Sequence, residues 1–148
     1  MSARLLDGNA VAAAIREAVL PDVQRFTRSS GRPPGLGIVL VGEDPASEIY
    51  VRNKVKAGSE TGLWVDLQRL PATASLDDLL GLVERLNASD VHDGILVQSP
   101  LPDAMGKHAA QRVFDAIDPA RDVDGFTRAM SGVSSRAVRI WCHARRRA

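Results

Sequence analysis

The chain has 148 residues, of which 45% are hydrophobic and 25% charged, a composition typical of a soluble globular domain with its own core. Cys142 is the only cysteine, which excludes an internal disulfide, and no Cys/His cluster has the spacing of a metal site. No apolar run is long enough to cross a bilayer, and the first residues lack the basic-then-apolar order of a signal peptide. We therefore expect a cytoplasmic protein with no membrane segment and no bound metal.

The formal net charge of +1 hides an uneven distribution along the chain. Residues 133–148 contain five arginines and no acid, whereas residues 1–132 hold 14 basic and 18 acidic residues, a net charge of −4. Because these basic residues are scattered and aromatic residues are few, the sequence predicts no nucleic-acid surface.

Taken in order, the first predicted element is a helix from Asp7 to about Arg28, with Asp7 or Asn9 as its N-cap. Pro21 is a point at which this helix can kink or split. A cluster of glycine, proline and serine over residues 29–35 then leads into the first strand.

Alternating strands and helices follow. The apolar, β-branched run Leu36–Val41 predicts a buried parallel strand, and Pro45 predicts the start of a helix that Gly62 ends. Further elements are expected as a strand at 64–70, a helix at 76–86 opened by Ser75, a strand at 93–98 and a helix at 105–117. This order predicts an α/β fold, a three-layer αβα domain with a mainly parallel sheet.

Three polar side chains share one face of the predicted second helix. Ser47, Tyr50 and Lys54 stand at i, i+3 and i+7, close to the carboxyl end of a strand, where open parallel sheets bind ligands. The alternative is a solvated helix face on which the lysine stem lies along the tyrosine ring.

The other candidate site residues can also be explained by purely structural roles. Gln98 ends the third predicted strand and can satisfy a backbone group there, while Asp124 lies in an aspartate-rich loop where a turn or cap role is common. Pro100 and Pro102 can serve only to end that strand, since neither can join a ladder. We treat His92 and His108 as surface residues.

Three blocks of sequence carry a resemblance to a known family: Val41–Ser47 running into Tyr50–Lys54, then Gly94–Gln98 with Pro100–Pro102, and Ile117–Pro119 with Asp122–Phe126. In this order and spacing they resemble the N-terminal catalytic domain of the bifunctional methylenetetrahydrofolate dehydrogenase/methenyltetrahydrofolate cyclohydrolase family. The likeness covers about residues 3–132.

The resemblance implies roles residue by residue. Lys54 matches the catalytic lysine, Tyr50 its aromatic and hydrogen-bonding partner, and Gln98 the residue that hydrogen-bonds that lysine. Asp124 matches the carboxylate that binds the pterin, since a carboxylate accepts two adjacent N–H donors in a bidentate manner. Ser47 and the segment Pro100, Leu101 and Pro102 match residues that line the substrate pocket. The implied partners are tetrahydrofolate derivatives, and the family forms homodimers.

The sequence departs from the family in a few places. Ser99 stands where an apolar residue is usual, and Gly58 where a cysteine is frequent. After Phe126 the family continues with His-Pro and an asparagine, whereas this chain retains clearly only Gly132. We therefore expect a folate-binding catalytic domain at 1–132 and an unmatched, disordered basic tail at 133–148. A truncated or frameshifted gene would account for this ending, and the alternative is that the chain is a natural single-domain paralogue.

The expected cofactor of the family is NADP or NAD. No Gly-x-Gly-x-x-Gly follows a strand in this sequence, so we expect the cofactor-binding domain to be absent from it. Three functions remain open: the bifunctional folate enzyme, a folate-binding remnant with little or no turnover, and a generic regulatory α/β domain.

Overall fold

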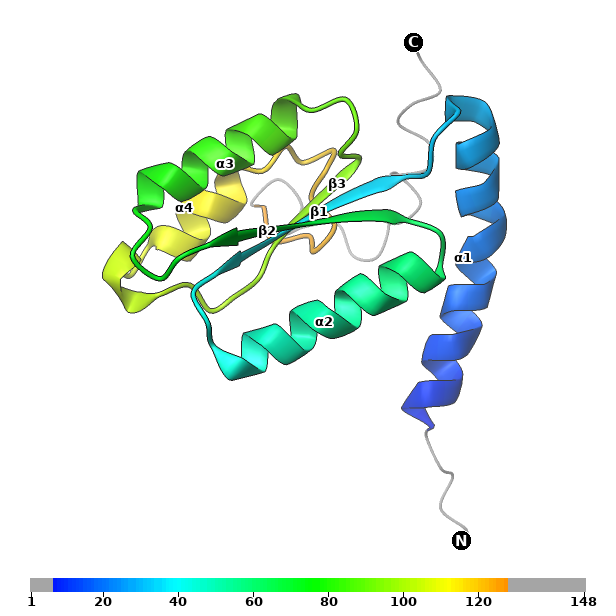
Figure 1. Cartoon of the computed structure of the whole chain (residues 1–148), viewed down its shortest axis with the longest axis horizontal. Helices are drawn as coiled ribbons and strands as arrows, with labels where there is room; N and C mark the ends of the chain where they lie inside the picture. The colour runs from blue at the N-terminus through cyan, green and yellow to red at the C-terminus, as the bar shows by residue number, and fades with distance from the viewer. Residues whose placement is uncertain (1–6, 128–148) are drawn as a thin grey trace, which may run out of the picture.

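The computed structural model describes residues 7–127, which form an α/β domain (Figure 1). The elements in chain order are α1 Gly8–Ser30, β1 Gly35–Val41, α2 Pro45–Glu60, β2 Trp64–Leu70, α3 Leu76–Ala88, β3 Gly94–Val97, the 3₁₀ helix η1 Asp103–Met105 and α4 Ala109–Ala116. The predicted domain boundary at residue 132 and the predicted tail at 133–148 lie outside the described residues.

The three strands form one parallel sheet in the order β2-β1-β3, with β1 in the centre. Ile38 of β1 pairs with Leu67 of β2 and with Leu96 of β3. Beyond β3, the segment around Asp122 makes a single parallel bridge to Ile95. Because all strands run the same way, the residues that follow β1 and β3 lie at the same edge of the sheet.

Alternation along β1 builds two cores, one on each face of the sheet. Val39 and Val41 face the core shared with α3 and α4, while Ile38 and Leu40 face α2. Figure 1 shows α3 and α4 together on one side of the sheet and α2 on the other. The predicted three-layer αβα arrangement is confirmed, because helices cover both faces of the sheet and β1 and β3 are buried almost throughout.

The first helix is continuous from Gly8 to Ser30 even though Pro21 lies within it. Asp7 is its N-cap, and the Asp7 carboxylate accepts hydrogen bonds from the N–H groups of Asn9 and Ala10. Only Val23 of this helix is buried, and Val11 and Ile15 are more than half exposed. Figure 1 shows the N-terminal half of α1 extending beyond the rest of the domain.

The predicted helix at 105–117 is wrong in its first part. Residues 103–105 form a 3₁₀ turn, Gly106 adopts a φ of 93°, and α4 begins only at Ala109. A positive φ is outside the helical region, so the chain cannot continue helically through Gly106. The other predicted elements are confirmed, with ends that differ by a residue or two.

His92 is buried, which corrects the prediction of a surface residue. Its exposed fraction is 7%, and its two ring nitrogens lie 2.7 Å from Ser89 Oγ and 2.9 Å from Asp66 Oδ2. The Trp64 ring packs against it with a centroid separation of 5.2 Å. The sequence window around His92 is polar and holds no sign of this contact, because Asp66 and Trp64 reach it from a neighbouring strand. His108, by contrast, is exposed.

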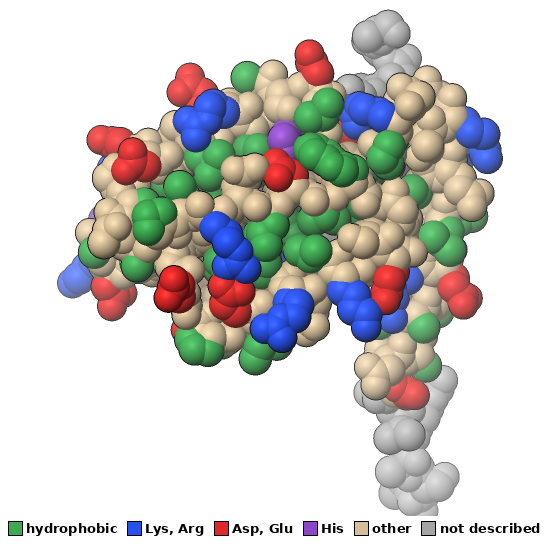
Figure 2. All heavy atoms as spheres, viewed as in Figure 1, with side chains coloured by type: hydrophobic (Ala, Val, Ile, Leu, Met, Phe, Trp, Pro, Cys, Tyr) green, Lys and Arg blue, Asp and Glu red, His purple; other side chains and the backbone are tan. Residues whose placement is uncertain are grey.

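The surface carries charges of both signs. In the view of Figure 2, basic and acidic side chains are interspersed around a central area of apolar side chains. Within residues 7–127, no helix is both long and apolar enough to span a membrane. In the same range, no group of three or more His, Cys, Asp or Glu side chains is arranged to hold a metal ion.

Candidate active site

Lys54 and Gln98 meet at the carboxyl edge of the sheet, although 44 residues separate them in the sequence. Lys54 lies on α2 and Gln98 directly follows β3. The Lys54 Nζ donates a hydrogen bond to Gln98 Oε1 at 3.2 Å, and both residues are partly buried. The predicted contact between these two side chains is therefore confirmed.

The backbone fixes which end of the Gln98 amide faces the lysine. Gln98 Nε2 donates to the Ser99 carbonyl oxygen at 2.6 Å, which leaves Oε1 for Lys54. Gln98 N in turn donates to Val39 O at 2.9 Å, so the residue is held by the central strand. The lysine thus has a neutral acceptor that adds no charge beside it.

Ser47 and Tyr50 share a helix with Lys54 but not its environment. Ser47 is 2% exposed, and its hydroxyl has no hydrogen-bond partner within residues 7–127, whereas Tyr50 is 62% exposed. Ser47 lies in the first turn of α2, where Asp44 caps the helix by accepting a hydrogen bond from Ser47 N at 2.7 Å. The predicted polar face of this helix therefore runs from a buried residue, Ser47, to an exposed one, Tyr50.

The carboxylate of Asp124 lies within electrostatic range of Lys54. Partial burial raises the pKa of Asp124 above its ordinary value, the Lys54 charge opposes this, and the negative charge of Asp122 adds to it. Asp124 still keeps access to solvent, which screens these effects. The structure thus brings together three predicted site residues: Lys54, Gln98 and Asp124.

The segment after Gln98 leaves the sheet, as its prolines predict. The Ser99–Pro100 peptide bond is cis, and Leu101 packs against the core on the α3 side. Pro102 lies near the β1–α2 turn, with its Cγ 3.8 Å from the position that a Cβ on Gly42 would take. Pro100 is exposed, so these residues differ in environment and only Pro102 reaches the turn that precedes α2.

Sequence reasoning singled out Asp124 and passed over Asp122. Asp122 is 6% exposed, and its carboxylate accepts hydrogen bonds from three backbone N–H groups of the loop that carries Asp124. The signal was present in the spacing Asp-x-Asp-Gly, because an aspartate that precedes a glycine by three residues commonly closes such a turn.

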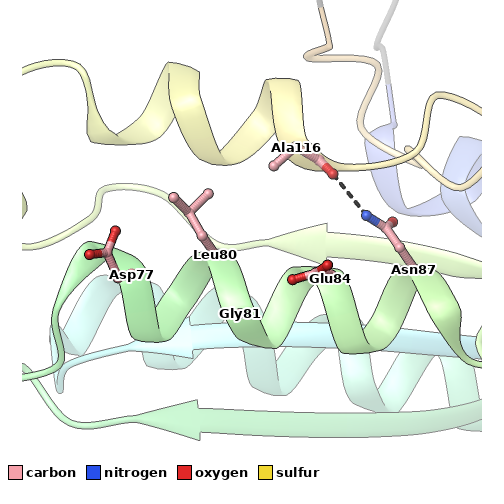
Figure 3. Close-up of a pocket in the computed structure, with 6 residues that line it drawn as sticks. All are labelled: Asp77, Leu80, Gly81, Glu84, Asn87 and Ala116. Atoms are coloured by element: carbon pink, nitrogen blue, oxygen red, sulfur yellow. Dashed lines mark hydrogen bonds between the residues drawn. The ribbon is translucent and has the colours of Figure 1, made fainter.

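Two surface hollows lie away from Lys54, on the outer side of α3. Figure 3 shows one of them, with a volume of about 440 Å³, between α3 and α4. Asn87 donates a hydrogen bond there to the Ala116 carbonyl oxygen at 2.8 Å, which ties the two helices together. Its lining includes Asp77 and Glu84 but no described group that favours an anion such as folate, so we place the site at Lys54 instead.

This is an α/β domain in which Lys54 contacts Gln98 at the carboxyl edge of the sheet and Asp124 lies within electrostatic range of the same lysine. These groups can bind a polar ligand and move protons. The tetrahydrofolate dehydrogenase/cyclohydrolase catalytic-domain model matches residues 6–124. The chain belongs to this family.

The relatives are consistent with this assignment. The bifunctional protein FolD of Sorangium cellulosum is 50% identical over 125 residues, covering 84% of this chain and 42% of the relative. FolD 3 of Rhizorhabdus wittichii is 53% identical over 124 residues, covering 84% and 40%. The chain therefore spans about two fifths of the length of the curated relatives it matches.

Solved structures of similar proteins support the same family assignment. The Campylobacter jejuni bifunctional FolD has a TM-score of 0.79 at 39% identity, covering 87% of this chain and 44% of that one. The Trypanosoma brucei FolD, solved with an NADP cofactor and inhibitor, has a TM-score of 0.76 at 34% identity, covering 84% and 41%.

Proposed function

We propose that this domain binds the pterin of a tetrahydrofolate and carries the groups that hydrolyse 5,10-methenyltetrahydrofolate to 10-formyltetrahydrofolate. The observation that carries the proposal is the 3.2 Å hydrogen bond between Lys54 and Gln98, with the Asp124 carboxylate in electrostatic range of the same lysine. Family membership over residues 6–124 supports it.

Recognition of the pterin falls to Asp124. The 2-amino-4-oxo edge of a reduced folate presents two adjacent N–H donors, and a carboxylate accepts both with its two oxygens. Partial burial makes such hydrogen bonds stronger than they are in water. Ser47 offers a buried hydroxyl without a partner in the described part, and Tyr50 offers an exposed aromatic ring. The segment Pro100, Leu101 and Pro102 offers apolar surface, with Pro102 near the turn that precedes α2.

Hydrolysis needs one water and three proton movements, two of which Lys54 can serve. The water oxygen bonds to the cationic bridge carbon, and one water proton passes to the Lys54 amine when that amine is neutral. The bond between the bridge carbon and N5 then breaks as N5 receives that proton. The hydroxyl oxygen forms the double bond to carbon and releases its own proton to solvent water, which leaves the formyl group on N10. Gln98 Oε1 holds the lysine in place for both transfers without adding a charge.

The described residues do not fit a dinucleotide cofactor. In parallel α/β folds the pyrophosphate binds at the N-terminus of a helix that follows a strand, but here acids already occupy the N-termini of α2 and α3. Asp44 caps α2 with Glu48 in its first turn, and α3 starts with Ser75, Asp77 and Asp78. A phosphate at either position would meet like charge. We therefore assign no step of the NAD- or NADP-dependent oxidation to residues 7–127.

A second candidate function is folate binding with little or no turnover, because no step of the oxidation is assigned to residues 7–127. Hydride transfer requires a nicotinamide held against the one-carbon bridge, and such positioning supplies roughly 7–11 kcal/mol of barrier lowering. We place the protein in the cytoplasm in either case.

The test uses the purified 148-residue chain. We expect weak binding of 5,10-methenyltetrahydrofolate, at most a trace of hydrolysis above the uncatalysed rate, and no measurable oxidation of methylenetetrahydrofolate with NADP or NAD. Asp124→Ala should abolish binding, and Lys54→Met should remove the residual hydrolysis. Lys56→Met is the matched control, since Lys56 is an exposed lysine of the same helix that pairs with Glu60 at 3.8 Å.

Two outcomes would overturn parts of this proposal. Failure of the wild-type chain to bind any reduced folate would refute the assigned function. Oxidation at an ordinary enzyme rate, on the order of 10 per second, would show that the chain holds its own cofactor site.

A further inference from the structure

Asp122 connects the sheet to the loop that carries Asp124. Its segment extends the sheet beside β3: Ile95 N donates to Arg121 O at 2.7 Å, and Val123 N donates to Ile95 O at 3.5 Å. The backbone of Asp122 is thus held by a buried strand, and its side chain is 6% exposed. The position of this residue is set by the core rather than by the loop.

The carboxylate of Asp122 then holds the next residues in a closed turn. Its Oδ1 accepts hydrogen bonds from Asp124 N at 3.1 Å and Gly125 N at 2.8 Å, and its Oδ2 accepts one from Thr127 N at 2.9 Å. Gly125 completes the turn with a φ of 72°. A single buried side chain therefore fixes the backbone on both sides of Asp124.

The orientation of this turn determines where the Asp124 carboxylate points. With the turn closed, Asp124 lies in electrostatic range of both Lys54 and Asp122, although its side chain makes no hydrogen bond within the described residues. An exposed aspartate on an open loop would sample many rotamers and lose binding energy when it is ordered by a ligand. A loop fixed in advance avoids much of that loss.

We propose that Asp122 is a positioning residue for pterin recognition, whose buried carboxylate closes the loop of residues 124–127 and so orients Asp124 toward a folate bound beside Lys54. This inference rests on the proposed function. It differs from a purely structural role in one respect: loss of Asp122 must weaken recognition of the pterin edge more than it weakens binding of the rest of the ligand.

The test compares tetrahydrofolate with its 2-desamino analogue, which lacks one of the two donors that Asp124 accepts. In Asp122→Asn the amide nitrogen would face a backbone N–H donor, so the turn should open while the size of the side chain is kept. We expect the affinity for tetrahydrofolate to fall roughly 10-fold or more, and the affinity for the analogue to fall less than about 3-fold. Thermal unfolding of each variant is measured in parallel.

Asp118→Asn is the matched control. Asp118 is an exposed aspartate shortly before the same loop, and its Oδ1 accepts a hydrogen bond from Ala120 N at 2.9 Å. The charge change is identical, so unchanged affinity for both ligands is expected. An equal loss for both ligands in Asp122→Asn would refute the positioning role. Failure of the wild-type chain to bind tetrahydrofolate would instead refute the proposed function.

Gly125→Ala provides a second route to the same loop if Asp122→Asn does not fold. A Cβ on Gly125 would meet no atom within 4 Å, so the substitution acts only through the strain of a positive φ. We expect the same selective loss of tetrahydrofolate affinity. Unchanged affinity for both ligands in a folded Gly125→Ala chain, with a lowered melting temperature, would show that the closed turn is not needed for recognition.

Discussion

The ion pair between Arg32 and Asp93 should be a main source of stability at the end of the sheet opposite Lys54. The Arg32 guanidinium donates to both oxygens of the Asp93 carboxylate, at 2.6 Å and 3.0 Å, and also to Asp90 O at 2.7 Å. Asp93 Oδ2 additionally accepts from Gly35 N at 2.8 Å. The pair joins the start of β1 to the start of β3, and the Asp93 side chain is only 4% exposed.

Arg32→Gln should destabilise the domain because the buried Asp93 carboxylate loses its ion pair with Arg32. Breaking a buried pair in this way costs about 3–5 kcal/mol. Because the Arg32 side chain is 26% exposed, water can replace part of the lost interaction, so we expect the lower end, about 3 kcal/mol. That is a large fraction of the roughly 5–15 kcal/mol that stabilises an ordinary domain.

Urea unfolding of the purified chain, followed by tryptophan fluorescence, measures this difference. Arg25→Gln is the control, since Arg25 pairs with Asp22 on the exposed face of α1 with side chains 60% and 45% exposed. Such surface pairs contribute about 1 kcal/mol or less. Equal losses of stability in Arg32→Gln and Arg25→Gln would refute the argument from burial. Folate affinity should not change in either variant.

Three further predictions concern the site and the tail. Gln98→Glu should hold Lys54 in its charged form and abolish residual hydrolysis while folate still binds, as rate and affinity measurements would show. Folate affinity should fall on acidification at a higher pH than an unperturbed aspartate would require, because burial raises the pKa of Asp124 and its carboxyl must be ionised; a pH series of dissociation constants tests this. Deleting residues 133–148 should leave the melting temperature unchanged or higher, measured by circular dichroism, since the segment is basic and lacks acids.

The same raised pKa links recognition to a cost in stability. A carboxyl whose folded-state pKa exceeds its unfolded value favours folding fully below the unfolded value and loses that contribution as pH rises through the folded value. Ionised Asp124 is thus unfavourable to the fold at neutral pH, although solvent access limits the effect. This is what a residue retained for ligand binding is expected to show.

Most of the fold could be predicted from local sequence. The β1 and β3 segments are short and apolar throughout, which is typical of strands buried on both faces, and Ser75 with Asp78 forms the capping box that its spacing predicts. The error at 105–117 arose because the apolar spacing of α4 was extended backward through Gly106. A glycine can adopt a helical or a positive φ, and which of the two Gly106 adopts depends on its tertiary surroundings.

The candidate site could be predicted only in part, because its residues come from separate elements. The family resemblance implies that Lys54 and Gln98 meet, and the structure confirms their contact, with Lys54 on α2 and Gln98 directly after β3. Burial was not predictable: Ser47 and Tyr50 are one helical turn apart yet 2% and 62% exposed. His92 was placed on the surface for the same reason, because its partners Asp66 and Trp64 belong to another strand.

Side-chain type and spacing within short segments are enough to predict the alternation of strands and helices, the starts of the helices and the family to which the chain belongs. Which atoms of those side chains meet depends on how the elements pack. The Lys54 amine meets Gln98 Oε1, and the His92 ring meets the Asp66 carboxylate. Hydrogen bonds of this kind depend on distances and angles that are fixed only when the strands have packed, so no local pattern encodes them.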